Sequence, residues 1–167
     1  MDALEVLFTR RSIRKYSNEP VTEEDLKTIL EAGMNAPSAN NRQPWHFVVV
    51  DDRAKLNAIM EVHPYSRMLA EAPIAIVVCG DTKISASFWP QDCAAATENI
   101  LLAARALDLG TVWMGVYPGQ ERVNEVHRLF NLPQRIQPLA IIALGHPAEE
   151  KGRVDRYQAE RVHKNEW

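Results

Sequence analysis

The sequence predicts an α+β domain in which helices flank a mixed central β-sheet. Three short apolar runs rich in β-branched residues are typical of buried strands, and helical segments separate them at irregular intervals. No G-x-G-x-x-G follows any of these runs, which excludes a dinucleotide-binding Rossmann unit. The chain has 167 residues, 46% of them hydrophobic. We therefore expect residues 1–167 to form a single domain around its own core.

Apolar periodicity and helix-terminus residues predict five helices. Thr22 and Asp25 resemble a capping box at the start of the second helix, and Pro37 ends that helix. The longest helix begins at Pro90 and stops at Gly110. Its apolar residues nearly encircle it, which predicts burial in a core or in an interface. The expected helices are 2–9, Thr22 to Pro37, 55–62, 90–109 and 120–130.

The expected strands are the apolar runs 47–50, 74–79 and 139–144, and a polar tail begins at Pro147. The glycine-flanked segment 110–118 has two interpretations. Its glycines allow the backbone to approach a ligand closely, with Trp113 and Met114 as apolar walls. The alternative is a strand with a bulge.

Composition excludes several functions. A formal net charge of −3 argues against nucleic-acid binding, and no apolar run is long enough to span a bilayer. Acidic residues near the N-terminus do not suit a signal peptide, so we expect a cytoplasmic protein. Cys79 and Cys93 are expected to be small buried side chains. The five histidines have no metal-ligand spacing, and no metal site is expected.

The run from Arg10 to Arg14 is the first segment that suggests chemistry. Three arginines and Ser12 lie within five residues of a chain that is not basic overall. Guanidinium groups bind phosphate with fixed geometry, and a hydroxyl can join them. Two charge-assisted hydrogen bonds would lower a ligand's dissociation constant by about 10² to 10⁴. The alternative is a helix C-terminus carrying cations, which the helix dipole favours.

Two further segments are polar. The segment 36–45, A-P-S-A-N-N-R-Q-P-W, leaves a helix and enters a strand, and its amide side chains suit the imide edge of a flat heterocycle. A polar connecting loop is the alternative. The tail segment 151–156 contains three basic residues and would by itself be a solvated charged stretch.

Together these segments resemble the nitroreductase family of flavoproteins, and its short members most closely. The resemblance is carried by R-R-S-I-R-K-Y at 10–16, the segment 36–45, D-C-A-A-A-T-E-N-I-L-L-A-A from Asp92, G-T-V-W-M-G at 110–115 and the ending R-Y…R-V-H-K-N-E-W. It implies an intertwined homodimer whose tail, from about residue 147, extends onto the partner subunit. It also implies FMN bound non-covalently between the subunits.

The resemblance implies a role for each matched position. The implied cofactor-binding residues are Arg10, Arg11, Ser12, Arg14, Pro37, Ser38, Ala39, Asn41, Gln43, Trp113, Met114, Gly115, Arg153 and Arg156. The resemblance puts Arg10, Ser12 and the tail arginines at the phosphate and ribityl end, with Arg11 acting mainly through its backbone. It puts Arg14 at the pyrimidine N1–O2 edge, the 110–115 segment near N5, and the 36–45 segment in the partner subunit.

The implied activity is electron transfer from NADH or NADPH to nitroaromatic, quinone or similar acceptors by a ping-pong mechanism. No catalytic side chain is required, because the flavin carries the hydride. Two alternatives stay open: a specialised flavin reaction, such as reductive dehalogenation or oxidation of a biosynthetic intermediate, and a non-enzymatic flavin-binding dimer. Phe88 and Trp89 are candidates for the wall of the acceptor pocket, with buried packing as the alternative.

Overall fold

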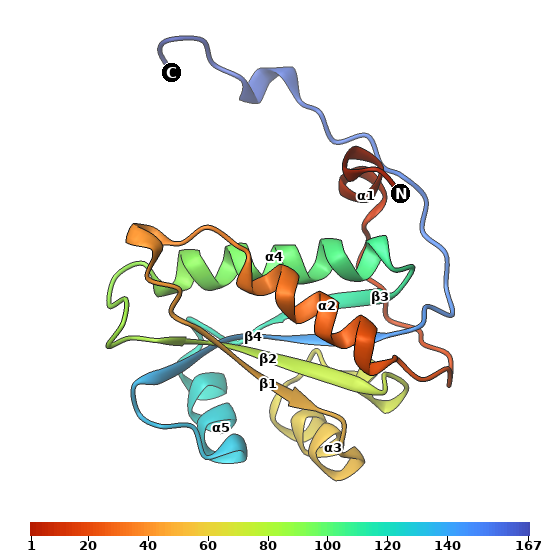
Figure 1. The fold of residues 1–167 in the computed structure, drawn as a ribbon, viewed down its shortest axis with the longest axis vertical. Coiled ribbons are helices and arrows are strands. Elements are labelled where there is room, and N and C mark those ends of the chain that lie inside the picture. The colour runs from red at the N-terminus through yellow and green to blue at the C-terminus, as the bar shows by residue number, and fades with distance from the viewer.

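The computed structural model describes residues 1–167 as a four-stranded sheet between two helical layers (Figure 1). Helices α2 and α4 cover one face of the sheet, and α3 and α5 cover the other. Helix α1 and the C-terminal tail lie together beside the end of α4. The elements are α1 (Ala3–Thr9), α2 (Glu23–Met34), β1 (Trp45–Val50), α3 (Arg53–Val62), β2 (Ile74–Asp81), α4 (Trp89–Ala106), β3 (Gly110–Gly115), α5 (Gln120–Phe130) and β4 (Ile136–Gly145).

The α+β class is confirmed, but the sheet is not mixed. Its strand order is β1-β2-β4-β3, and all three pairings are antiparallel. The one parallel pairing is an isolated bridge between Ser12 and Thr111, at the outer edge of β3. This bridge brings the arginine run against the sheet, because the Ile13 N–H donates to the Thr111 carbonyl at 2.9 Å.

The central strands read as continuous apolar runs because both of their faces are buried. In β2, Ala75, Val77 and Cys79 point to the core beneath α3 and α5, while Ile76 and Val78 point to the core beneath α2 and α4. Every residue of β2 is buried. The expected burial of Cys79 and Cys93 is confirmed, and desolvation raises the pKa of each thiol to about 12, so both stay protonated and unreactive.

Most predicted boundaries hold to within a few residues. The Thr22 hydroxyl accepts the Asp25 N–H at the start of α2, as the capping box predicts, and α5 has the expected bounds. Helix α4 is shorter than predicted. It stops at Ala106, and Asp108 turns the chain with a φ of 59°. Gly110 instead begins β3, where a Cβ would lie 2.8 Å from the Ile13 side chain.

Burial within this chain explains only some of the apolar residues that encircle α4. Ala96, Ile100 and Ala104 are fully buried against the sheet and α2. Ala95 and Leu102 are only partly buried. Within one chain the helix is therefore a core helix with a partly open apolar side.

Replacing Gly80 with alanine is expected to destabilise the fold by roughly 1–3 kcal/mol, the range for an overpacked core. An added Cβ would lie 2.6 Å from Trp89 Cε3 and 3.0 Å from Cys93 Sγ, so α4 would have to shift. The matched control is Gly152→Ala, because nothing lies within 4 Å of a Cβ at that position. Urea unfolding of both variants checks the prediction, and equal midpoints would contradict it.

Candidate functional site

The arginine run is an extended segment held by its apolar residues. Helix α1 ends at Thr9 with Arg10 as its C-cap, so the helix-terminus interpretation covers only the first arginine. Ile13 and Tyr16 are buried in the core next to β3. Ser12 and Arg14, on either side of Ile13, are not buried: Ser12 is partly exposed and Arg14 is exposed. Burial of the apolar residues thus leaves the polar side chains of the run available for a ligand.

A cavity of about 290 Å³, here called the cationic cavity, lies over this run. Its lining is polar throughout and consists of Arg10, Arg11, Ser12, Arg14, Lys151 and Arg156. Two hydrogen bonds bring the tail to the run: Lys151 Nζ donates to the Ser12 carbonyl at 2.6 Å, and Arg11 donates to the Gly152 carbonyl at 2.7 Å. Five cations around one hydroxyl suit the binding of a phosphate group.

Arg153 does not reach the cationic cavity. Its guanidinium lies over the Phe8 ring at 4.3 Å from the centroid, in a separate groove between α1 and the tail. Lys151 occupies the place in the cavity expected for Arg153. The sequence motif contained both residues, but spacing alone does not say which of them folds back onto the run.

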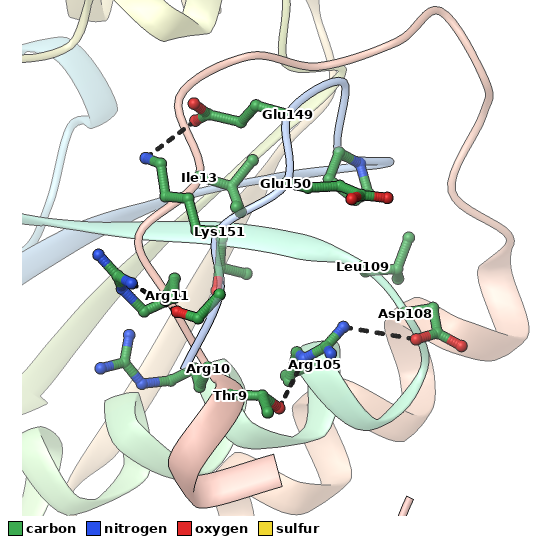
Figure 2. A pocket seen from close by; sticks show the side chains of 13 residues that line it. Thr9, Arg10, Arg11, Ile13, Arg105, Asp108, Leu109, Glu149, Glu150 and Lys151 are labelled. Carbon is green, nitrogen blue, oxygen red and sulfur yellow. Dashed lines mark hydrogen bonds and ion pairs between the residues drawn. The ribbon is translucent and has the colours of Figure 1, made fainter. Parts of the chain in front are cut away.

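A second cavity, of about 400 Å³, lies behind the run between α4 and the tail (Figure 2). Several of its charged groups have partners within it. Arg105 Nε donates to Thr9 Oγ1 at 3.1 Å and its Nη1 lies 3.5 Å from Asp108, while Lys151 lies 3.1 Å from Glu149. These contacts fix the run, the tail and the end of α4 relative to one another, so we interpret this cavity as scaffolding.

Glu149 holds the run through the backbone. Its carboxylate accepts the Arg14 N–H at 2.5 Å, and this bond, with help from Lys151, keeps the pKa of Glu149 below its ordinary value of 4.5. A lowered pKa means that the contact stabilises the fold above pH 4.5 and is lost as the pH falls below it.

We therefore expect acidification from pH 6 to pH 3 to lower the melting temperature more in the wild type than in Glu149→Gln. The difference should be about 2–4 °C, the effect of roughly 1 kcal/mol in a chain of this size. Thermal melts across this pH range check the prediction. Parallel pH curves for the two proteins would contradict it.

A third cavity, of about 440 Å³, lies at the free edge of β3 and is called the edge cavity. It is lined by Arg14, His63, Pro64, Tyr65, Arg67, Met68, Val112, Trp113, Met114 and Gly115. Segment 110–115 is a strand, as the alternative interpretation proposed, but it contains no bulge. The interpretation as a glycine-flanked ligand contact also has support, because a Cβ on Gly115 would meet nothing within 4 Å and the backbone there is open to a ligand. Trp113 is 37% exposed, whereas Met114 is buried in the core at 3%.

Arg14 lies in both the cationic cavity and the edge cavity. A ligand with a phosphate at one end and a flat ring at the other can therefore occupy the two cavities along the edge of β3. Arg67 and His63 were missed by the sequence analysis. Arg67 lies in a short 3₁₀ turn before β2, and only the tertiary fold makes that turn line one cavity with residues of β3.

Loop 38–43 is rigid but lies elsewhere in this chain. The Ser38 hydroxyl accepts the Gln43 N–H at 3.0 Å, Gln43 donates to Asn41 at 3.0 Å, and the Ala39 N–H donates to buried Asp92 at 2.9 Å. Asn41 and Gln43 have positive φ. Their side chains and Pro37 are exposed.

Within one chain this loop and the arginine run are not brought together. Asp92 bonds the loop at the start of α4 (Figure 1). The run lies further along that helix, because Glu98 is 3.4 Å from Arg10 and Arg105 bonds Thr9, the residue just before the run. Arg105 comes thirteen positions after Asp92, which corresponds to about 20 Å along the helix axis. Neither the cationic cavity nor the edge cavity includes a residue of the loop.

The fold is that of an α+β protein in which a cationic cavity and a partly apolar cavity meet at Arg14. The Nitroreductase family model matches residues 7–146, and the chain belongs to this family. It is 49% identical over 169 residues to a protein of Methanothermobacter thermautotrophicus that bears the provisional name NADH dehydrogenase/NAD(P)H nitroreductase, covering 100% of this chain and 88% of that one.

Two solved structures extend the likeness. A provisionally named NADH dehydrogenase/NAD(P)H nitroreductase from Parabacteroides distasonis is 42% identical, with a TM-score of 0.96 over 99% of this chain and 98% of that one. A provisionally named nitroreductase from Desulfovibrio desulfuricans, solved in complex with FMN, is 34% identical, with a TM-score of 0.86 over 100% and 98%. None of the helices is both long and apolar enough to cross a membrane.

Proposed function

We propose that the protein takes electrons from NADH or NADPH and passes them to nitroaromatic compounds, quinones or similar small acceptors. Its enzyme class, an FMN-dependent NAD(P)H oxidoreductase, follows from its family and from the relatives that share it. The observation that carries the proposal is the pair of cavities joined at Arg14, one wholly polar and cationic and the other partly apolar.

The side chains of the two cavities fit the chemistry of FMN. Arg10, Ser12, Lys151 and Arg156 would hold the phosphate and ribityl oxygens, with Arg11 contributing mainly through its backbone. Arg14 and Arg67 would lie at the polar edge of the ring, over the floor formed by Trp113, Met114 and Gly115. When bound, FMN supplies a ring that accepts hydride from the donor and returns electrons to the acceptor.

The protein's own contribution to this chemistry is positioning and charge. A fixed cation at the ring edge stabilises the negative charge that builds up there on reduction. We propose that donor and acceptor use the same open side of the site in turn, so that the oxidised donor leaves before the acceptor binds. No nucleophile or proton-transfer triad is needed for this scheme.

We also propose that the site is completed by a second copy of the chain. Loop 38–43 is held at the start of α4 and lines neither cavity, so a partner's loop is the candidate for the remaining wall. The tail after Lys151 is exposed along its whole length and is proposed to extend onto that partner. Exposed apolar side chains on α1 and the tail support this arrangement, namely Leu4, Leu7, Phe8, Tyr157, Val162 and Trp167.

Phe88 is our candidate for the acceptor wall. Trp89 is buried and stacks edge-on against Tyr117 at 4.9 Å, so its role is packing. Phe88 is 46% exposed and belongs to the segment tied to loop 38–43 through the Arg42–Ile84 and Ala39–Asp92 hydrogen bonds. A partner loop at the ring would bring this side chain with it. The cytoplasmic location expected from the sequence stays a prediction.

The test is a screen of the purified protein for NADH and NADPH oxidation with nitroaromatic, quinone and free flavin acceptors, together with sedimentation. We expect a yellow dimer whose flavin is released by acid and whose bound flavin is bleached by the nicotinamide donor. A colourless protein that does not bind added FMN would overturn the function. A monomer that retains FMN would overturn the shared site, and bleaching without turnover of any acceptor would favour a specialised reaction.

A further inference from the structure

His63 is a buried polar side chain inside the edge cavity. Only 2% of it is exposed, and it follows the last residue of α3. Its Nε2 lies 3.0 Å from the Gly115 carbonyl oxygen, at the end of β3. Its Nδ1 lies 3.3 Å from the Tyr65 backbone nitrogen. Both ring nitrogens are therefore paired with the main chain of two separate segments.

These two partners select one form of the imidazole. A carbonyl oxygen only accepts, so Nε2 must carry the proton that it donates to Gly115. A backbone N–H only donates, so Nδ1 must be unprotonated to accept from Tyr65. The arrangement is thus that of the neutral tautomer protonated at Nε2. The charged groups that line the same cavity are Arg14 and Arg67.

The same residue organises the turn that carries Arg67. The His63 carbonyl accepts the Ser66 hydroxyl at 2.7 Å and the Ser66 N–H at 3.2 Å. The 3₁₀ turn that begins at Arg67 follows directly. Through its ring and its backbone, His63 therefore connects this turn to the final residue of β3.

We infer that His63 is a positioning residue, which ties the Gly115 floor of the edge cavity to the Arg67 turn and so sets their separation. This inference rests on the proposed function, because the positioned groups are those assigned to the flavin ring. Without the imidazole bonds, the turn would keep its hydrogen bonds to the His63 carbonyl but would lose its connection to Gly115, so the distance between Arg67 and the floor would no longer be fixed. Reduced flavin, which carries more negative charge than oxidised flavin, would then lose more affinity.

The first measurement needs no cofactor. Nitrogen NMR of the apoprotein is expected to show His63 protonated at Nε2 only. Hydrogen exchange at the Tyr65 amide should rise about fivefold in His63→Leu, the effect of losing one net hydrogen bond. A proton on Nδ1, or unchanged exchange at Tyr65, would overturn the inference whether or not the protein binds FMN.

The second measurement uses the FMN-loaded protein. In His63→Leu we expect reduced FMN to lose about tenfold more affinity than oxidised FMN, which corresponds to a fall of about 30 mV in the two-electron potential. His63→Gln, which offers a donor and an acceptor on one side chain, should stay within about twofold of the wild type. A glutamine variant that behaves like the leucine variant would overturn the inference.

The matched control is His127→Leu. His127 also bonds a backbone carbonyl, that of Leu132 at 3.3 Å, but it lies on α5 and lines neither cavity. It should lower stability without moving the potential. Equal shifts in the two leucine variants would show a general structural effect and overturn the positioning role. A wild type that does not bind FMN would instead refute the proposed function, and the NMR result would still decide the state of His63.

Discussion

Deleting residues 151–167 is expected to weaken FMN binding by about 10²- to 10⁴-fold, the value of two charge-assisted hydrogen bonds. The deletion removes Lys151 and Arg156 from the cationic cavity. The fold should survive, because the residues after Lys151 are exposed and belong to neither core cluster. Flavin fluorescence titration measures the affinity, and a thermal melt tests whether the remaining chain is folded.

A double variant separates the two proposed roles of the tail. Lys151→Ala with Arg156→Ala removes the cations but leaves the chain that is proposed to reach the partner. It should lose most of the affinity that the deletion loses. Arg161→Ala is the control, because Arg161 is an exposed tail residue outside the cavity. A dissociation constant that stays within threefold of the wild type in the double variant would remove the tail from the phosphate site.

Replacing Arg14 with alanine is expected to weaken FMN binding by about 10- to 10²-fold, the value of one charge-assisted hydrogen bond. Arg14 is the one residue that lines both cavities. Its guanidinium makes no hydrogen bond or ion pair within the chain, so the charge is available to a ligand. The loss should be larger for reduced than for oxidised FMN, and titration combined with a potential measurement tests both effects.

Three further variants serve as comparisons for Arg14→Ala. Arg14→Lys keeps the charge but loses the planar fork, and it should fall between the wild type and the alanine variant. Arg10→Ala should have a smaller effect, because Glu98 lies 3.4 Å from Arg10 and already shares its charge. Arg128→Ala, on the exposed side of α5, should have no effect. Unchanged FMN affinity in both Arg10→Ala and Arg14→Ala would contradict the role of the arginine run.

Local signals predicted the elements well. The capping hydroxyl of Thr22, the bounds of α5 and the apolar runs of β2 and β4 all act within a few residues of one another. The end of α4 was predicted at the wrong residue because Gly110 was taken for a helix terminator. In the structure, the turn at Asp108 ends the helix. A glycine is needed at position 110 because the side chain of Ile13, which is distant in the sequence, packs directly against it.

The direction in which neighbouring strands pair could not be predicted from local sequence signals. An apolar run predicts a buried strand, but the same pattern suits a parallel or an antiparallel neighbour when both faces are covered. The prediction of a mixed sheet was therefore wrong, and all strand pairings of the sheet are antiparallel. Its single parallel contact, between Ser12 and Thr111, is the one that places the arginine run at the site.

By itself, the sequence determined the chemical character of the site: a cationic run, a rigid amide-rich loop and a glycine-flanked strand are visible as short motifs. The tertiary structure alone decided which residues meet. Lys151, rather than Arg153, reaches Ser12 across 139 residues, and His63 and the turn with Arg67 line one cavity with residues of β3. The physical reason is range, since capping and periodicity act over about one helical turn. The site, by contrast, is assembled by burial of Ile13, Tyr16 and Met114 in a common core, which joins segments about 100 residues apart in the chain.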